Sequence, residues 1–428
     1  MQLVAYGAQD IYLTGNPQIT FFKVVYRRHT NFSMECIEQT LTGSLTAAAS
    51  NVTATISRNG DLISSMHLEV VLTAGATGAT GGTYVNWTNN TGHAYLDTVE
   101  LEIGGQRIDR HYGHWLDVWN ELTDHDGNER TLINKHSAKN AYLQSNNDAA
   151  NALGLTMYVP LKFWFNRNPG LALPLIALQY HEVKVKVATR NLLNLLNSNN
   201  TTGTAAITSL GVATKLYVDY IYLDTDERRR FAQQSHEYLI EQLQYQTQTA
   251  GSSVKLNLNH PVKELIWTVQ DTNANTAVTA LQDTGADATA NTSDAIADGN
   301  DWFNYDGGHQ TADKTERLNG QQSREGFNSL VLQLNGHDRF SSRRASYFRT
   351  VQPYQAGHRV PEKHVYVYSF ALKPEEHQPS GTCNFSRIDN AKMEFGSTGA
   401  PTGNLNVYAV NYNVLRIMSG MGGLAYSN

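Results

Sequence analysis

Apolar and polar residues alternate with a period of two along much of this chain, a pattern typical of β-strands that bury one face. In Val99–Ile103 the apolar side chains share one face, while Glu100 and Glu102 share the other. The alternation recurs at Val183–Val187 and Leu256–Asn259. Further strands are predicted at Leu68–Leu72, Tyr158–Phe165, Leu216–Leu223, Glu264–Val269, Leu330–Leu334, Val365–Leu372, Lys392–Phe395 and Leu405–Val410. Because strands do not alternate with long helices, antiparallel sandwiches are favoured over a parallel α/β sheet.

Two segments have a helical pattern instead. In Trp115–Leu122 the apolar residues recur at spacings of three and four and share one face, so we expect a helix that covers one end of a barrel. Asp226–Gln234 begins with acidic residues and carries charge throughout. This second pattern predicts a helical connector near the middle of the chain.

The two halves of the chain repeat one another weakly. Each contains, in the same order, a strand with a glycine turn, an aromatic strand and a long closing strand: Leu101–Ile108, Met157–Phe165 and Lys215–Asp224 in the first half, and Leu332–Phe340, Val365–Leu372 and Asn404–Ile417 in the second. Repetition of this kind predicts a duplicated β-sandwich. We expect an N-terminal arm at 1–30, a first sandwich at 31–224, a linker at 225–238 and a second sandwich at 239–428.

Composition narrows the class of protein. The chain has 428 residues, more than the ~250–300 at which a single core stops growing, which agrees with two domains. Its net charge of −6 gives no general attraction to phosphate, so direct genome binding is not expected. The cysteines Cys36 and Cys383 are far apart in sequence and indicate separate thiols in a reducing compartment. Neither a signal peptide nor an apolar run of eighteen residues is present in the sequence.

Both ends of the chain, Tyr6–Ser33 and Asn411–Asn428, resemble the major capsid proteins of large icosahedral nucleocytoplasmic double-stranded DNA viruses, the chlorella-virus type most of all. The resemblance continues through Ile56–Leu62, Gly104–Asp109, Pro169–Val183, His236–Leu243, Val351–Gln355 and Gln378–Ala391. It spans most of the chain. Residues 271–326 and the loop Gly396–Gly403 depart from the family pattern.

The resemblance implies an all-β double jelly roll, with two tandem eight-stranded antiparallel sandwiches and a few short helices in loops. It further implies a virion structural protein that forms homotrimers of pseudo-hexagonal outline. These capsomers assemble the icosahedral shell with minor capsid proteins, in the host cytoplasm, and meet an inner membrane only indirectly. No enzymatic activity and no cofactor are expected.

The N-terminal arm carries the residue types that are enriched at interface hot spots. The family resemblance places such an arm beneath the capsid wall. We therefore expect an assembly role for Phe21, Phe22, Tyr26, Arg27 and Arg28. The other basic groups, Arg228–Arg230 and Arg343–Arg344, are also interpreted as interface or intramolecular arginines, because arginine pairs bidentately with carboxylates.

Candidate chemistry elsewhere is sparse. His111, His114 and His125 lie close in sequence, but no further Cys/His pair at ligand spacing completes a metal site. The glycine-rich Gly420–Gly423 opens no helix, which disfavours a phosphate site. No GxSxG elbow occurs, so a hydrolase is not predicted.

A jelly-roll lectin that binds host-surface glycans is the alternative function, because Asp301–Asp306 places aromatic residues beside Asp and Asn. Relatives also suggest that the protein itself carries glycans on outward loops. The candidate acceptors are Asn86, Asn89, Asn273, Asn275, Asn291 and Asn304.

Overall fold

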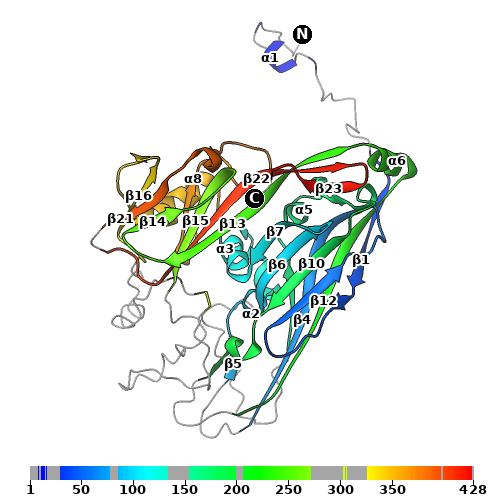
Figure 1. Ribbon diagram of the computed structural model, residues 1–428, viewed down its shortest axis with the longest axis horizontal. Coiled ribbons are helices and arrows are strands. Elements are labelled where there is room, and N and C mark those ends of the chain that lie inside the picture. The colour runs from blue at the N-terminus through cyan, green and yellow to red at the C-terminus, as the bar shows by residue number, and fades with distance from the viewer. Residues whose placement is uncertain are drawn as a thin grey trace, which may run out of the picture.

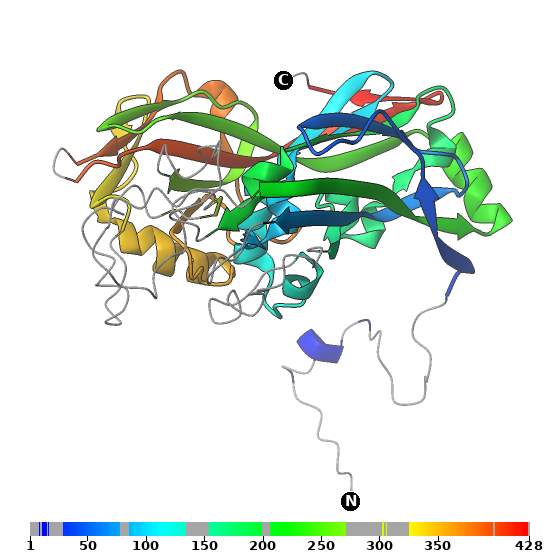
Figure 2. The ribbon, with the colours of Figure 1, turned by 90° about the horizontal axis from the view of Figure 1, so that it is seen from below.

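The computed structural model shows a mostly β molecule with short helices (Figure 1). It describes residues 29–77, 85–133, 154–198, 206–270, 325–396 and 399–426, together with residues 8, 11–14, 16, 302, 303 and 305. Two β-sandwiches lie side by side, the first on the right of Figure 1 and the second on the left. Figure 2 shows the same two bodies from below.

The first sandwich consists of two antiparallel sheets. One has the order β1 (Phe32–Gln39), β12 (Ala206–Leu223), β4 (Leu62–Thr77) and β8 (Leu155–Pro160). The other has the order β3 (Ser50–Thr55), β10 (Val183–Thr189), β6 (Leu96–Ile103) and β7 (Gln106–Tyr112). The two-residue strands β2 (Leu41–Thr42) and β9 (Leu173–Pro174) pair with β3 and β4.

The second sandwich has the same construction. One sheet has the order β13 (His236–Thr249), β22 (Asn404–Met418), β15 (Pro261–Gln270) and β19 (Val365–Ser369). The other has the order β14 (Ser253–Leu256), β21 (Ala391–Phe395), β16 (Ser329–Leu334) and β17 (His337–Asp338). Shorter strands are β18 (Arg343–Arg344), β20 (Cys383–Asn384) and β23 (Met421–Leu424), and β5 (Val85–Trp87) pairs with β11 (Leu196–Ser198).

The strand order shows the duplication directly. When the eight main strands of each half are numbered in chain order, both halves have one sheet of order 1-8-3-6 and a facing sheet of order 2-7-4-5. This is the arrangement of a jelly roll, in which distant strands pair across the sheet. The predicted all-β double jelly roll is therefore confirmed.

The helices are short and lie in connections. They are α1 (Ile11–Thr14), α2 (Thr91–Tyr95), α3 (Gly113–Thr123), α4 (Glu129–Leu132), α5 (Trp164–Arg167), α6 (Thr225–Gln233) and α8 (Gln352–Ala356), preceded by the π-helix η5 (Tyr347–Val351). The 3₁₀ turns are η1 (Pro169–Leu171), η2 (Leu175–Ala177), η3 (Leu192–Leu195) and η6 (Phe385–Arg387).

Where apolar and polar residues alternate in the sequence, buried and solvent-facing side chains alternate in the strand. In β10 the residues Val183, Val185 and Val187 are buried, while Lys184 and Lys186 lie toward solvent. Each sandwich closes around its own apolar core. At ~25 cal/mol per Å² of apolar surface, these cores are the main source of stability.

Three predicted strands end earlier than their patterns suggest. The strand predicted at Leu256–Asn259 stops at Leu256, because the chain turns at His260, whose φ is 63°. The strand predicted at Tyr158–Phe165 stops at Pro160, and its last residues begin α5, since consecutive buried aromatics do not suit a two-faced strand. The strand predicted at Val365–Leu372 stops at Ser369.

The connector between the halves is the predicted helix, shifted by one residue. In α6 the side chain of Asp224 accepts a hydrogen bond from the N–H of Thr225, and the helix ends at Gln233. Strand β13 then begins at His236, so residues 236–238, which the sequence assigned to the linker, lie in a strand. From there β13 runs back beside β22 toward the second sandwich (Figure 1).

Candidate functional site

The two sandwiches are joined through one face of the sheet β13-β22-β15-β19. Its inward side chains pack in the core of the second sandwich, whereas its outward side chains belong to the core of the first. The outward set is Ile240, Ile266, Val365, Val367, Tyr408 and Val410. Because this sheet contributes side chains to both cores, it ties the two sandwiches together.

We term the contact region between the two sandwiches the joint. Helix α3 is the main element that the first sandwich contributes to it. Trp115 packs against the ring of Tyr408, with centroids 5.3 Å apart, and all residues from Trp115 to Leu122 are buried. Its polar side also has partners in the second half, which the expected place at one end of a barrel did not include. There, Glu121 accepts a hydrogen bond from the N–H of Glu362 (2.9 Å).

Backbone groups reinforce the joint. The N–H of Arg359 donates to the carbonyl of Leu122 (2.8 Å), and the N–H of Leu243 donates to the carboxylate of Asp109 (3.1 Å). Tyr245 also packs its ring against Tyr112, with centroids 4.4 Å apart. Such directional contacts fix the orientation of the two sandwiches as well as their proximity.

A buried ion cluster crosses the joint. Glu241 in β13 contacts Arg167 of α5 (2.8 Å) and Lys263 of β15 (2.7 Å), and Lys263 is fully buried. Burial by itself would raise the pKa of Glu241, but Arg167, His377 and Lys263 outweigh it and hold this pKa at about 2. The carboxylate therefore remains ionised and links both sandwiches.

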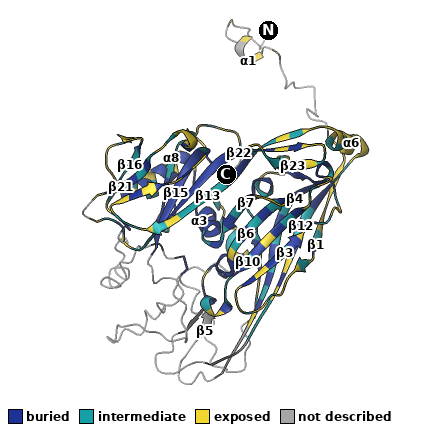
Figure 3. Ribbon diagram, in the orientation of Figure 1, coloured by how far each residue is buried: buried dark blue, intermediate teal, exposed yellow. Residues whose placement is uncertain are grey.

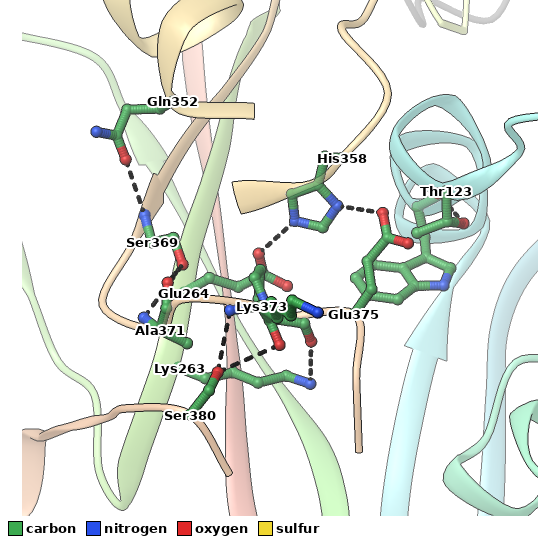
Figure 4. A network of polar contacts seen from close by, with 12 residues as sticks. Thr123, Lys263, Glu264, Gln352, His358, Ser369, Ala371, Lys373, Glu375 and Ser380 are labelled. Atoms are coloured by element: carbon green, nitrogen blue, oxygen red, sulfur yellow. Dashed lines mark hydrogen bonds and ion pairs between the residues drawn. The ribbon is translucent and has the colours of Figure 1, made fainter. Parts of the chain in front are cut away.

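A second buried cluster centres on His358 (Figure 4). Its ring contacts Glu264 of β15 (2.8 Å) through Nε2 and Glu375 (2.7 Å) through Nδ1. Burial would lower the pKa of His358, but the two carboxylates outweigh it and raise this pKa to about 9. Glu375 also faces His125 of the first half at 3.4 Å, so the cluster reaches across the joint to the surface.

Three aromatic residues that precede the second-half strand β16 also pack at the joint. The indole N–H of Trp302 donates to the carbonyl of Asn194 (2.7 Å), and the hydroxyl of Tyr305 donates to Asp117 (2.9 Å). Trp302, Phe303 and Tyr305 are all buried. The lectin hypothesis rested on these aromatics beside Asp and Asn, and the three buried rings present no face to a sugar.

The candidate histidine ligands have other partners. His111 faces Asp109 at 2.9 Å, and His114 contacts the carbonyl of Trp302 at 3.0 Å. Burial and the nearby Arg190 lower the pKa of His114 to about 3, despite the opposing charge of Asp117. Among the described residues no group of three or more His, Cys, Asp or Glu side chains could hold a metal ion.

Most of the predicted assembly and glycan residues lie outside the described residues. These are Phe21, Phe22, Tyr26, Arg27, Arg28, Asn273, Asn275, Asn291 and Asn304. Asn86 lies in β5, and its side chain is not described. Asn89 is exposed, and its side-chain oxygen accepts a hydrogen bond from the N–H of Asn90 (3.0 Å).

The basic groups and the cysteines are also placed. Arg228 of α6 pairs with the buried Asp61 at 2.8 Å, an intramolecular contact of the kind predicted for this group. Arg343 lies over the ring of Tyr347, and Arg344 is exposed. Cys36 and Cys383 are free thiols. No helix in the described part of the chain is long and apolar enough to cross a membrane.

Sequence reasoning missed the ionic residues of the joint. Lys263 and Glu264 stand side by side in an otherwise apolar strand, and this is the one local signal that pointed to them. Glu241, His358 and Glu375 occur in segments with no distinctive pattern. The arrangement as a whole holds two sandwiches rigidly together; it is a structural joint rather than a reaction centre.

Comparison with known proteins accounts for nearly the whole chain. Residues 20–224 match the family described as "Major capsid protein N-terminus". Residues 227–423 match the family described as "Large eukaryotic DNA virus major capsid protein". The boundary between the two matches falls at the start of α6.

Individual relatives extend the match to full length. The chain is 48% identical to the major capsid protein of Pyramimonas orientalis virus and 46% identical to that of Paramecium bursaria Chlorella virus 1, covering 100% of this chain and 99% of each relative. A solved chain described as "PBCV-1 virus capsid, quasi-atomic model" is similar with a TM-score of 0.74 and 42% identity. That match covers 96% of this chain and 100% of the solved one.

Proposed function

The chain belongs to the major capsid protein family of large eukaryotic DNA viruses, which forms the virion shell, and from this premise we propose that three copies build each shell unit. The family is structural and non-enzymatic. Capsid proteins of this kind assemble into the shell with copies of themselves. The proposal concerns the form of that assembly: a homotrimer with a pseudo-hexagonal outline.

The observation that carries the proposal is the repeated 1-8-3-6 and 2-7-4-5 strand order within one chain. Two similar sandwiches held in fixed orientation present two similar sides. Three chains then present six, and a six-sided block tiles a flat facet. The buried joint supports this geometry, because it keeps the two sandwiches of a chain from turning against each other.

Contacts of two strengths follow from this arrangement. Contacts within a trimer are permanent and bury above ~2,000 Å², as obligate interfaces do. Contacts between trimers are individually weak, with dissociation constants of about 1 mM, near −4 kcal/mol. Many such contacts made together give a stable shell that still corrects errors during growth.

The domain organisation is proposed in the same terms. Residues 1–30 form an arm, 31–224 the first sandwich and 239–428 the second, with the linker ending where β13 begins. The two matched families, which meet near residue 225, support this division. Within the arm, Phe21, Phe22, Tyr26, Arg27 and Arg28 make the contacts to neighbouring capsomers and minor capsid proteins.

The setting of assembly is the host cytoplasm, supported by the two free thiols. The net charge of −6 supports a wall that does not bind the genome and that meets the inner membrane only through other proteins. If outward loops carry glycans, the acceptors are among Asn86, Asn89, Asn273, Asn275, Asn291 and Asn304. Mass spectrometry of peptides from purified virions tests each of these positions.

The trimer is tested by static light scattering of the purified protein over a dilution series. We expect a mass three times that of the 47.5 kDa chain down to the lowest concentration measured. Circular dichroism on the same samples shows whether the chain is folded. A monodisperse folded monomer throughout the series would contradict the proposal.

A further inference from the structure

The two sandwiches differ in what covers equivalent sheets. The sheet β13-β22-β15-β19 is covered on its outer face by α3, and β15 is buried at nine of its ten positions. The equivalent sheet of the first sandwich, β1-β12-β4-β8, has no such cover among the described residues. Burial alternates along β4 and β12, and β1 is exposed along most of its length (Figure 3).

The outer face of β1-β12-β4-β8, which we term the open sheet face, mixes aromatic and charged side chains. Strand pairing places Tyr217 beside His67, and Glu69 between Lys215 and Tyr158. The ring of His67 stacks on Tyr217 at 5.3 Å, and Tyr158 is 40% exposed. This mixture of side chains is typical of a surface that is exposed to solvent in the free chain and covered by another subunit after assembly.

The second sandwich carries an equivalent of α3. Helix α3 follows the fifth main strand of its sandwich, β7, and precedes the sixth, β8. In the second sandwich η5 and α8, which we term the η5–α8 segment, follow the fifth main strand, β17, and precede the sixth, β19. This segment buries Phe348 in its own core but leaves Val351 39% and Tyr354 77% exposed. Whereas α3 is buried on every side, its counterpart has one uncovered side.

We propose that the η5–α8 segment of one copy packs on the open sheet face of the next copy, repeating between chains the contact that α3 makes within a chain. This inference rests on the proposed trimer. In Figure 1 α8 lies in the left-hand sandwich and β1, β12 and β4 lie in the right-hand one, so the contact is made with a neighbouring copy. Three such contacts alternate with three internal joints and close a ring of six sandwiches.

Charge supports the pairing. Arg343 and Arg344, in β18 next to η5, are both exposed. The open sheet face carries the carboxylates of Glu38, Glu69 and Asp219 against the single cation Lys215. Exposed arginines on one surface and an excess of carboxylates on the other favour a head-to-tail contact over a contact between two like surfaces.

Cysteine crosslinking tests the contact in the full chain. Cys36 and Cys383 are first replaced by serine, because Cys36 is exposed on β1. Tyr354→Cys is then combined with a cysteine at Thr156, Tyr158 or Lys215, and the trimer is treated with a short bifunctional maleimide. Leu372→Cys, at a position 78% exposed but outside the η5–α8 segment, replaces Tyr354→Cys in the control.

We expect dimers and trimers on a denaturing gel from at least one Tyr354→Cys combination, and monomers from the Leu372→Cys controls. Mixing chains that carry Tyr354→Cys alone with chains that carry the sheet cysteine alone gives crosslinked dimers, because the contact is between unlike surfaces. A protein that is trimeric by light scattering but crosslinks no better than its control would overturn this interface and leave the trimer intact. A protein that stays monomeric would overturn both proposals.

A second variant does not depend on the reach of a crosslinker. Tyr354→Ala removes an exposed ring and should not disturb folding, as circular dichroism will show. In a mild urea concentration chosen so that the unmodified trimer dissociates on dilution, we expect the variant trimer to dissociate at a protein concentration at least about tenfold higher, the effect typical of an aromatic hot spot. Leu372→Ala is the matched control and leaves dissociation unchanged. Equal dissociation of the two variants would count against the interface.

Discussion

At the scale of single residues, the joint depends on a few buried charges with fixed partners. His358 lies between two carboxylates, and Glu241 lies between two cations. A buried ion that keeps its partner is tolerated, whereas one that loses it destabilises the fold strongly. Stability should therefore respond both to pH and to substitution at these positions.

His358 predicts a loss of stability at alkaline pH. Its pKa is raised from 6.5 to about 9 in the folded chain, so its contribution is fully present below about pH 6.5 and is lost as pH rises through 9. The whole effect is on the order of 3 kcal/mol in the free energy of unfolding. Urea unfolding from pH 6 to 9.5 measures it.

The variant His358→Gln is the control for that series. It should be less stable than the unmodified chain at pH 6, and its stability should fall less between pH 6.5 and 9. Parallel curves for the two proteins would show that another group causes the pH dependence.

The ion cluster predicts that removing its carboxylate destabilises the fold more than removing one of its cations. Glu241→Gln leaves Lys263 and Arg167 facing each other without their shared carboxylate, so we expect a loss of about 3–5 kcal/mol. Lys263→Met leaves Glu241 paired with Arg167 and should cost clearly less. Denaturant unfolding of both variants at pH 7 measures the difference. A larger loss in Lys263→Met would show that Arg167 is not an effective partner.

At the scale of elements, local pattern predicted strands well where one face meets a core and the other meets solvent. The strands Val99–Ile103 and Val183–Val187 lie within β6 and β10 as expected. It also found the strands Glu264–Val269 and Leu405–Val410 within β15 and β22, but it did not show that both faces of their sheet are covered. Helix α3 was expected at a barrel end, and its actual place between two sandwiches depends on partners in the other half of the chain, such as Tyr408.

Helix α3 predicts that a cavity at the joint loosens both sandwiches together. Trp115→Ala removes a buried ring that packs against Trp119 and Tyr408, and we expect a loss of about 3–5 kcal/mol. Hydrogen exchange should become faster in β22 and β13 as well as in α3. Faster exchange confined to the first sandwich would show that α3 does not stabilise the second.

At the scale of the whole molecule, the fixed pair of sandwiches is the functional unit. A shell built from flat facets requires rigid blocks, and the joint supplies rigidity through apolar burial, directional hydrogen bonds and paired ions.

The arm predicts a separation between trimer formation and shell assembly. Deletion of residues 1–24 should leave a folded trimer with an unfolding temperature close to that of the full chain, because the arm precedes the first sandwich. Shell assembly, observed by electron microscopy, should fail. Loss of the trimer would show that the arm belongs to the fold, and normal shells would show that it is dispensable.

The sequence by itself determined the class of fold, its duplication and its family. Alternation with period two, a repeated order of segments and long family-like blocks are patterns among residues that are close in sequence. Such patterns can be recognised without knowing the fold. Their outcome, an all-β chain of two tandem sandwiches, agrees with the observed strand order and with the similarity to a solved capsid chain.

Only the tertiary structure decided how the sandwiches meet. Glu241 and Arg167, Glu264 and His358, and Tyr305 and Asp117 are each separated by dozens of residues or more, so no local pattern brings them together. The same reason explains why the burial of Trp302 and Phe303, which were candidates for sugar binding, could not be predicted from their sequence neighbours. Burial is set by what folds over a segment, and that depends on the path of the whole chain.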